Sequence, residues 1–136
     1  MPERRTLKKA RAARRAGKSP TTQAGEFVRE ELHHVREGKH GARSAKQAIA
    51  IGLSKARRAG VKLPTRPGTR DKAEEAKAGR KPSATRSRAT RAALKKEGRS
   101  AASHIALSRH AHKAAANRSA ASRSRAAKKA AATRKR

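Results

Sequence analysis

The chain has 136 residues, of which 39 are Lys or Arg and 9 are Asp or Glu, so its formal net charge is +30 and its pI is about 12. The positive side chains of such a chain repel one another. This repulsion is tolerated only when a polyanion neutralises the charge or when the chain stays extended. The absence of Cys excludes disulfides and thiolate zinc sites. No apolar run is long enough for a membrane span or a secretory signal sequence, so we expect neither.

Side chains that build a hydrophobic core are scarce. The sequence has thirteen Val, Ile, Leu and Phe residues, and nine of them fall between residues 19 and 64. Such a low share is typical of chains that are largely disordered. The 32 Ala residues favour helix but bury little surface. We therefore predict a mainly α chain with extensive disorder: a small helical hairpin with basic, conditionally helical arms.

Residues 1–18 are predicted to form a basic N-terminal arm. Pro2 and Glu3 stand where a helix would begin, basic residues interleaved with Ala follow, and Gly17 would end the helix. Only Leu7 offers a packing contact. We expect this helix to fray until phosphates neutralise it.

Residues 19–64 form the one predicted domain, a hairpin of two helices. The first helix should begin at Ser19 and end at Gly38. The second should begin at Ser44, where an S-x-x-Q pattern matches a capping box, and should end at Gly60. Because the core is thin, we expect the hairpin to dimerise or to fold on binding nucleic acid.

Each predicted helix has an apolar face. In the first helix the face consists of Ala24, Val28, Leu32 and Val35, with Phe27 beside it. In the second helix it consists of Ala45, Ile49, Gly52, Leu53 and Ala56. Ile51 projects away from that face, so either Val61 and Leu63 fold back over it or a partner covers it.

The remaining half is strongly basic. Residues 65–82 read as a linker with a short polar helix that would run from Asp71 to Gly79. Residues 83–136 read as a C-terminal arm with helix-permissive segments at 82–97 and 100–116. We expect the tail from residue 118 onward to be disordered when free.

Part of the hairpin resembles a known family. The segment Lys46-Gln-Ala-Ile-Ala-Ile-Gly-Leu-Ser-Lys-Ala, preceded by Glu37-Gly-Lys-His-Gly, is similar to a small uncharacterised bacterial domain with a K-Q-A-I-A-I-A-L-S signature, although Gly52 replaces the usual Ala. The resemblance covers about residues 19–64 and implies no particular chemistry. The arms are similar in composition to linker histones and bacterial histone-like proteins, which implies compaction of DNA.

The loop at residues 38–44 is a candidate phosphate clamp. Gly38 and Gly41 leave the backbone accessible, and Ser44 opens a helix whose free N–H groups attract anions. Three cations surround that helix end: Lys39, Arg43 and Lys46. The alternative is an ordinary hairpin loop whose amides meet water.

Neither a metal site nor a catalytic site is predicted. The six His residues include no pair at i, i+4 and have no Cys beside them, so we expect them at solvated helix positions. The four Glu residues of the first hairpin helix are expected to complement its dipole and to pair with nearby Arg. We therefore expect a non-enzymatic protein without a cofactor or a small-molecule substrate.

Nucleic acid is the expected partner, and duplex DNA is favoured because stacking aromatic residues are missing: there is one Phe and no Tyr or Trp. The predicted function is sequence-independent coating of DNA in a cytoplasmic, nucleoid-associated protein. The predicted phosphate contacts are Arg4, Arg5, Lys8, Lys9, Arg11, Arg14, Arg15, Lys39, Arg43, Ser44, Lys46, Lys55, Arg57, Arg58, Arg86, Arg88, Arg91, Arg123, Arg125, Lys128 and Lys129. The alternatives are binding to structured RNA or the ribosome, and a cationic membrane-active or secreted effector. The lack of an amphipathic helix with aromatic anchors counts against the effector.

Overall fold

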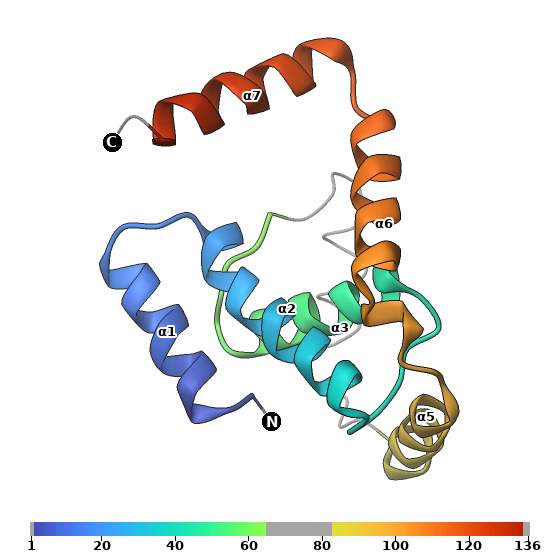
Figure 1. Ribbon diagram of the computed structural model, residues 1–136. Helices are drawn as coiled ribbons and strands as arrows, with labels where there is room; N and C mark the ends of the chain where they lie inside the picture. Colours follow the sequence, from blue (N-terminus) through green and yellow to red (C-terminus); the bar gives the residue numbers. More distant parts are fainter. Residues whose placement is uncertain (1, 65–82, 135–136) are drawn as a thin grey trace.

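The computed structural model describes residues 2–64 and 83–134, and these residues form helices joined by short loops (Figure 1). The mainly α class predicted from the sequence is confirmed. In chain order the helices are α1 (Arg4–Arg15), α2 (Pro20–Glu37), α3 (Ala45–Arg58), α5 (Ala84–Lys96), the 3-10 turn η1 (Ser100–Ala102), α6 (His104–Ala116) and α7 (Ala120–Arg134). The polar helix predicted from Asp71 to Gly79 lies outside the described residues. Among the helices described, none is both long and apolar enough to cross a bilayer.

Helix α2 has the predicted boundaries. The Ser19 hydroxyl accepts a hydrogen bond from the backbone N–H of Thr22, and Pro20 occupies the first helical position, where its missing N–H is harmless. At the other end, Gly38 adopts a left-handed conformation with φ of 76°. The chain therefore reverses sharply after α2.

Helix α3 begins with the predicted capping box. The Ser44 hydroxyl accepts from the N–H of Gln47 at 3.2 Å, and the Gln47 side chain accepts from the N–H of Arg43 at 2.8 Å. The helix ends at Arg58, and Gly60 follows with φ of 87°. The two helices thus form the expected hairpin.

Small residues make the contact between α2 and α3. The side of α3 that is buried consists of Ala45, Ala48, Gly52 and Ala56. A Cβ on Gly52 would lie 2.7 Å from Cα of Val28, so the glycine sets how closely the helices approach. The buried face of α3 is therefore rotated about the helix axis relative to the predicted one. Ala48 lies at the centre of the contact, and Ile49 and Leu53 lie at its edges, where they are half-buried.

The segment after α3 returns to the core. Val61 and Leu63 pack against a cluster centred on Phe27, which is 1% exposed. Ile51 is half-buried. The segment thus folds back onto the Phe27 cluster, while what covers Ile51, the question raised by the sequence, stays open between the two alternatives.

Helix α1 packs against α2 rather than projecting from the hairpin (Figure 1). Thr6 and Ala10 are buried in the contact, and the backbone N–H of Glu3 donates to Oε2 of Glu30 at 3.2 Å. The sequence had suggested a single packing contact, Leu7. Because Thr6 and Ala10 are small, they allow a close helix approach that a search for large apolar residues does not detect.

The segment between α5 and α6 also docks on the hairpin. The N–H of Gly41 donates to the carbonyl of Leu94 at 2.8 Å, and the N–H of Ala42 donates to the carbonyl of Gly98 at 3.2 Å. Ala101 and Ala102 are buried in a cluster with α2 and α3. The C-terminal half is thus anchored at this point, whereas the sequence had predicted a basic arm throughout.

Beyond this anchor the chain extends away from the core. Helix α6 leads outward, and α7 turns away from its end (Figure 1). Helices α5 and α7 have no buried residue. The predicted disordered tail is therefore helical in this structure, and its helicity depends on its high Ala content rather than on packing.

Replacing Gly41 by Ala is expected to detach the docked segment. The new Cβ would lie 1.9 Å from the carbonyl oxygen of Glu97, a backbone atom that cannot move without displacing its neighbours. Loss of two backbone hydrogen bonds, about 1 kcal/mol each, should reduce hydrogen-exchange protection of the Ala42 amide by roughly 30-fold. The control is Gly25→Ala, because nothing lies within 4 Å of that position. Unchanged protection in the Gly41 variant would contradict the docking.

Candidate nucleic-acid interface

Helix α1 presents one face to the protein and the opposite face to solvent. Thr6 and Ala10 are buried against α2. At 100° per residue, a strip on the opposite face carries four exposed cations: Arg4, Lys8, Arg11 and Arg15. The small buried residues thus fix the helix so that its cations point outward together. With Leu7 and Arg14 they line an open groove along α1.

The other predicted phosphate contacts are spread over the remaining helices. All of them except Lys55 are exposed. Those outside α1 and the loop at 38–44 are Lys46, Arg57 and Arg58 on α3, Arg86, Arg88 and Arg91 on α5, and Arg123, Arg125, Lys128 and Lys129 on α7. The structure therefore presents these cations on several separate helices rather than in one patch.

In the described part of the chain, most acidic residues lie on or against α2. Each of the six in the described part of the chain contacts a cationic or imidazole side chain: Glu3, Glu26, Glu30, Glu31, Glu37 and Glu97. Helices α1, α5, α6 and α7 contain no acidic residue. The negative charge of these six residues is thus partnered within the protein. The outward-facing cations of α1, α5, α6 and α7 have no acidic residue on their own helix.

Two of these carboxylates have a perturbed pKa. A hydrogen bond from His34 lowers the pKa of Glu3, and the nearby charge of Lys39 adds to this. A hydrogen bond from Lys39 likewise lowers the pKa of Glu37, and the same contact raises the pKa of Lys39. Lys39 is therefore engaged by two carboxylates, at 3.0 Å and 3.7 Å.

Four of the predicted phosphate contacts are occupied by carboxylates. Lys9 lies 4.0 Å from Glu26, and Arg43 lies 3.6 Å from Glu97. Lys39 is paired as described. The side chain of Lys55 is only 18% exposed and forms an ion pair with the buried Glu31. Lys55 is therefore a structural cation, and we leave it out of the interface.

Most backbone N–H groups of the loop at residues 38–44 are used within the protein. The N–H groups of Lys39, Gly41, Ala42 and Arg43 donate respectively to His34, Leu94, Gly98 and Gln47. The Ser44 hydroxyl is used by the helix cap. These groups are therefore not available to a phosphate, and the glycines serve a close contact between two protein segments; a phosphate at the first amides of α3 stays a prediction.

The structure brings together three residues that were not predicted to lie near one another. Glu31, His34 and His40 have ligand-type atoms within 4.8 Å of one another. The side chains of His34 and His40 are 13% and 20% exposed, so the expectation that all six His residues are solvated is wrong for these two. The signal in the sequence was Glu31-x-x-His34, which places both side chains on one face of α2.

The comparison with protein families gives one match. Residues 11–67 match the model of a family of unknown function (DUF6496). Neither the curated proteins nor the solved structures contain a significant match. The match begins within α1 and extends past α3, so it includes part of the helix that packs on the hairpin. Over residues 11–67 the chain is therefore similar to this uncharacterised family.

Proposed function

We propose that the protein coats duplex DNA by neutralising its phosphates, without reading its sequence. The observation that carries the proposal is the strip of exposed cations on α1, held outward by the packing of the opposite face. A net charge of +30 supplies the driving force, because each phosphate that is neutralised releases condensed counterions.

The dimensions of the strip suit a phosphate backbone. From Arg4 to Arg15 the helix rises by about 16 Å at 1.5 Å per residue. This length corresponds to about five base pairs of duplex at 3.4 Å per pair. One helix can therefore contact several phosphates along one edge of a groove, and the exposed cations of α3, α5 and α7 can extend the contact.

The chemistry of the exposed residues favours backbone contacts over base contacts. The only aromatic residue of the Phe, Tyr and Trp class is Phe27, which is buried, so no such side chain is available to stack on a base. Contacts to phosphate fix position but carry no direct sequence information. Binding should therefore depend on the charge and shape of the nucleic acid and hardly on its sequence.

The double variant Lys8→Gln/Arg11→Gln is expected to weaken duplex binding by roughly 60-fold at 0.1 M salt. Each phosphate contact strengthens binding by about 0.9 powers of ten when the salt concentration falls tenfold, from 1 M to 0.1 M. Loss of two such contacts therefore weakens binding at 0.1 M by about 1.8 powers of ten. The measurement is fluorescence anisotropy with a labelled duplex.

The matched control is Lys9→Gln/Lys39→Gln, which removes the same charge from positions that already contact carboxylates. It should weaken binding less than tenfold. Equal losses in the two double variants would show that net charge alone matters and that the α1 strip is not an interface. Structured RNA and anionic vesicles tested in parallel distinguish the alternative partners, and tighter binding to either would overturn the assignment to duplex DNA.

A further inference from the structure

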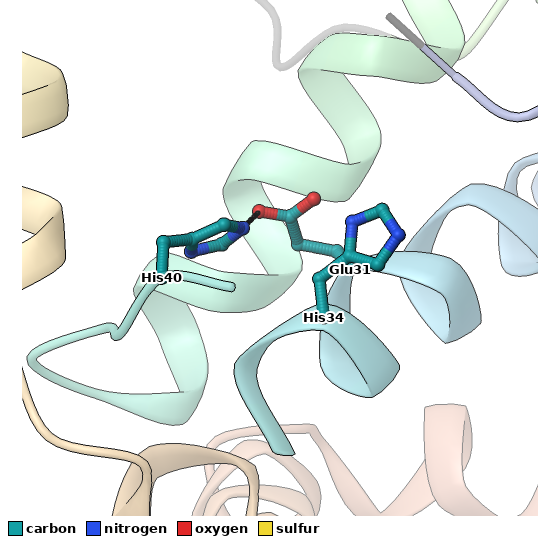
Figure 2. A group of neighbouring side chains, drawn as sticks. All are labelled: Glu31, His34 and His40. Carbon is teal, nitrogen blue, oxygen red and sulfur yellow. Dashed lines mark ion pairs between the residues drawn. The ribbon is translucent and has the colours of Figure 1, made fainter. Parts of the chain in front are cut away.

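A buried polar cluster lies where α2, α3 and the loop after α2 meet (Figure 2). Glu31 and His34 come from adjacent turns at the end of α2, and His40 comes from the loop. The left-handed turn at Gly38 returns the chain alongside α2, which brings His40 to the Glu31 carboxylate. Figure 2 shows the carboxylate between the two imidazole rings.

The outer nitrogens of both rings face oxygen acceptors. Nδ1 of His40 lies 3.1 Å from the carbonyl oxygen of Gly41, and Nε2 of His34 lies 3.0 Å from Oε1 of Glu3. When these nitrogens carry the ring protons, the inner nitrogens, Nε2 of His40 and Nδ1 of His34, present lone pairs to Glu31. Histidines that bind metals are typically oriented in this way by a carbonyl or a carboxylate on the outer nitrogen.

The carboxylate of Glu31 has two close polar neighbours but no hydrogen bond. Both of its oxygens are shielded from solvent, and neither has a hydrogen bond of acceptable direction. Oε1 lies 3.0 Å from Nε2 of His40, and Oε2 forms the ion pair with Lys55. Although both neighbours are close, their geometry is not that of a hydrogen bond. Lys55 supplies a cation to Oε2, so Oε1 is the buried oxygen at which a further cation would be stabilising.

One distance within the cluster is close to that between two ligands of one ion, and the third ligand atom lies near enough to join them after a small side-chain movement. Two ligands of a tetrahedral zinc ion, each at 2.0–2.1 Å from the metal, lie about 3.3 Å apart. Oε1 of Glu31 and Nε2 of His40 are 3.0 Å apart, and all three residues offer an atom within 4.8 Å of the others. Lys55 occupies the other oxygen, so it can remain in place when Oε1 is used.

We propose that Glu31, His34 and His40 form a binding site for a divalent transition-metal ion of the zinc type. Two imidazoles and one carboxylate are a ligand set that zinc uses in proteins, with the fourth position open to water. Imidazole nitrogen selects zinc, cobalt or nickel over magnesium and calcium, which prefer oxygen ligands. Such an ion would join the end of α2 to the loop on which the C-terminal half docks.

The test is titration of the full chain with Zn²⁺ by calorimetry, in a buffer without phosphate or nucleic acid. We expect one tight site per chain, and Co²⁺ should give the intense visible absorption of tetrahedral coordination. His34→Gln and His40→Gln should each weaken Zn²⁺ binding by more than about 100-fold, and Glu3→Gln, which replaces the charged acceptor on His34 with a neutral amide, by about 10- to 100-fold.

The matched control is His33→Gln, because His33 is the neighbouring residue on α2 with a side chain 69% exposed. The affinity of the His33→Gln variant for Zn²⁺ should equal that of the unmodified protein. Circular dichroism reports whether each variant is folded, and Glu3→Gln provides a variant that leaves all three ligands intact. Equal Zn²⁺ affinity in the His33, His34 and His40 variants would overturn the proposal. Mg²⁺ binding as tight as Zn²⁺ binding would overturn it as well.

Discussion

Raising the salt concentration from 50 to 200 mM is expected to weaken binding to duplex DNA by on the order of 10⁵-fold. The expectation assumes that about ten phosphates are neutralised at once, each contributing about −0.9 to the slope of log affinity against log salt. The exposed cations of α1, α3, α5 and α7 are sufficient for ten such contacts even when the residues paired with carboxylates are left out.

The sequence of the duplex should matter much less than the salt. Scrambling a duplex of constant length and base composition is expected to change the affinity less than tenfold, because contacts to phosphate do not read bases. A protein that relied on base contacts would lose roughly 1–3 kcal/mol for each altered base pair. A comparison of the affinities for two unrelated duplexes at one salt concentration therefore distinguishes binding through phosphates from binding through bases.

Replacing Lys55 by Met is expected to destabilise the folded helical core by about 3 kcal/mol. Lys55 is the cation that faces Glu30 and Glu31, which are 7% and 0% exposed, from the opposite helix. Removing one partner of a buried ion pair leaves an uncompensated charge, which costs far more than loss of an exposed pair. Since the free energy of unfolding of small domains is only about 5–15 kcal/mol, the variant would lose a large part of it.

Urea denaturation followed by circular dichroism measures this effect. Arg58→Met is the control, because Arg58 is exposed on the same helix and should change stability by less than about 0.5 kcal/mol. Adding Glu31→Gln to the Lys55 variant should restore part of the lost stability, since the carboxylate no longer needs a cation. An unchanged denaturation midpoint in Lys55→Met would mean that the ion pair is not formed in solution.

The boundaries of the hairpin could be predicted from the sequence because they are set locally. Ser19 and Ser44 cap α2 and α3 through their own hydroxyls, and Gly38 ends α2 through its own backbone conformation. Each signal lies within a few residues of the feature that it sets. Local chemistry of this kind does not depend on the rest of the fold.

The packing of α1 and the docking of the segment after α5 could not be predicted, because small residues make both contacts. Thr6 and Ala10 bury α1, while Ala101 and Ala102 bury the C-terminal segment. In a chain with 32 Ala residues, nothing in the sequence distinguishes those that are buried from those that are exposed. Gly41 was predicted to leave its backbone accessible, whereas in the structure another segment of the protein lies directly against it.

The cations of the candidate interface could be predicted from the sequence, but the directions in which they point could not. The spacing of Arg4, Lys8, Arg11 and Arg15 along one face of a helix is visible in the sequence, whereas the direction of that face depends on where α1 packs. The burial of Lys55 depends on two Glu residues of another helix. The cluster of Glu31 with two histidines likewise requires the turn at Gly38.

The central claim, coating of DNA by phosphate neutralisation, is tested most directly by salt titrations of the full chain and of residues 1–118 on two unrelated duplexes. The truncation removes α7, which has no buried residue, together with seven cations: Arg123, Arg125, Lys128, Lys129, Arg134, Lys135 and Arg136. We predict a steep slope for the full chain, a distinctly shallower slope for the truncated chain, and the same slopes on both duplexes. A slope near zero, or a strong preference for one duplex, would contradict the account.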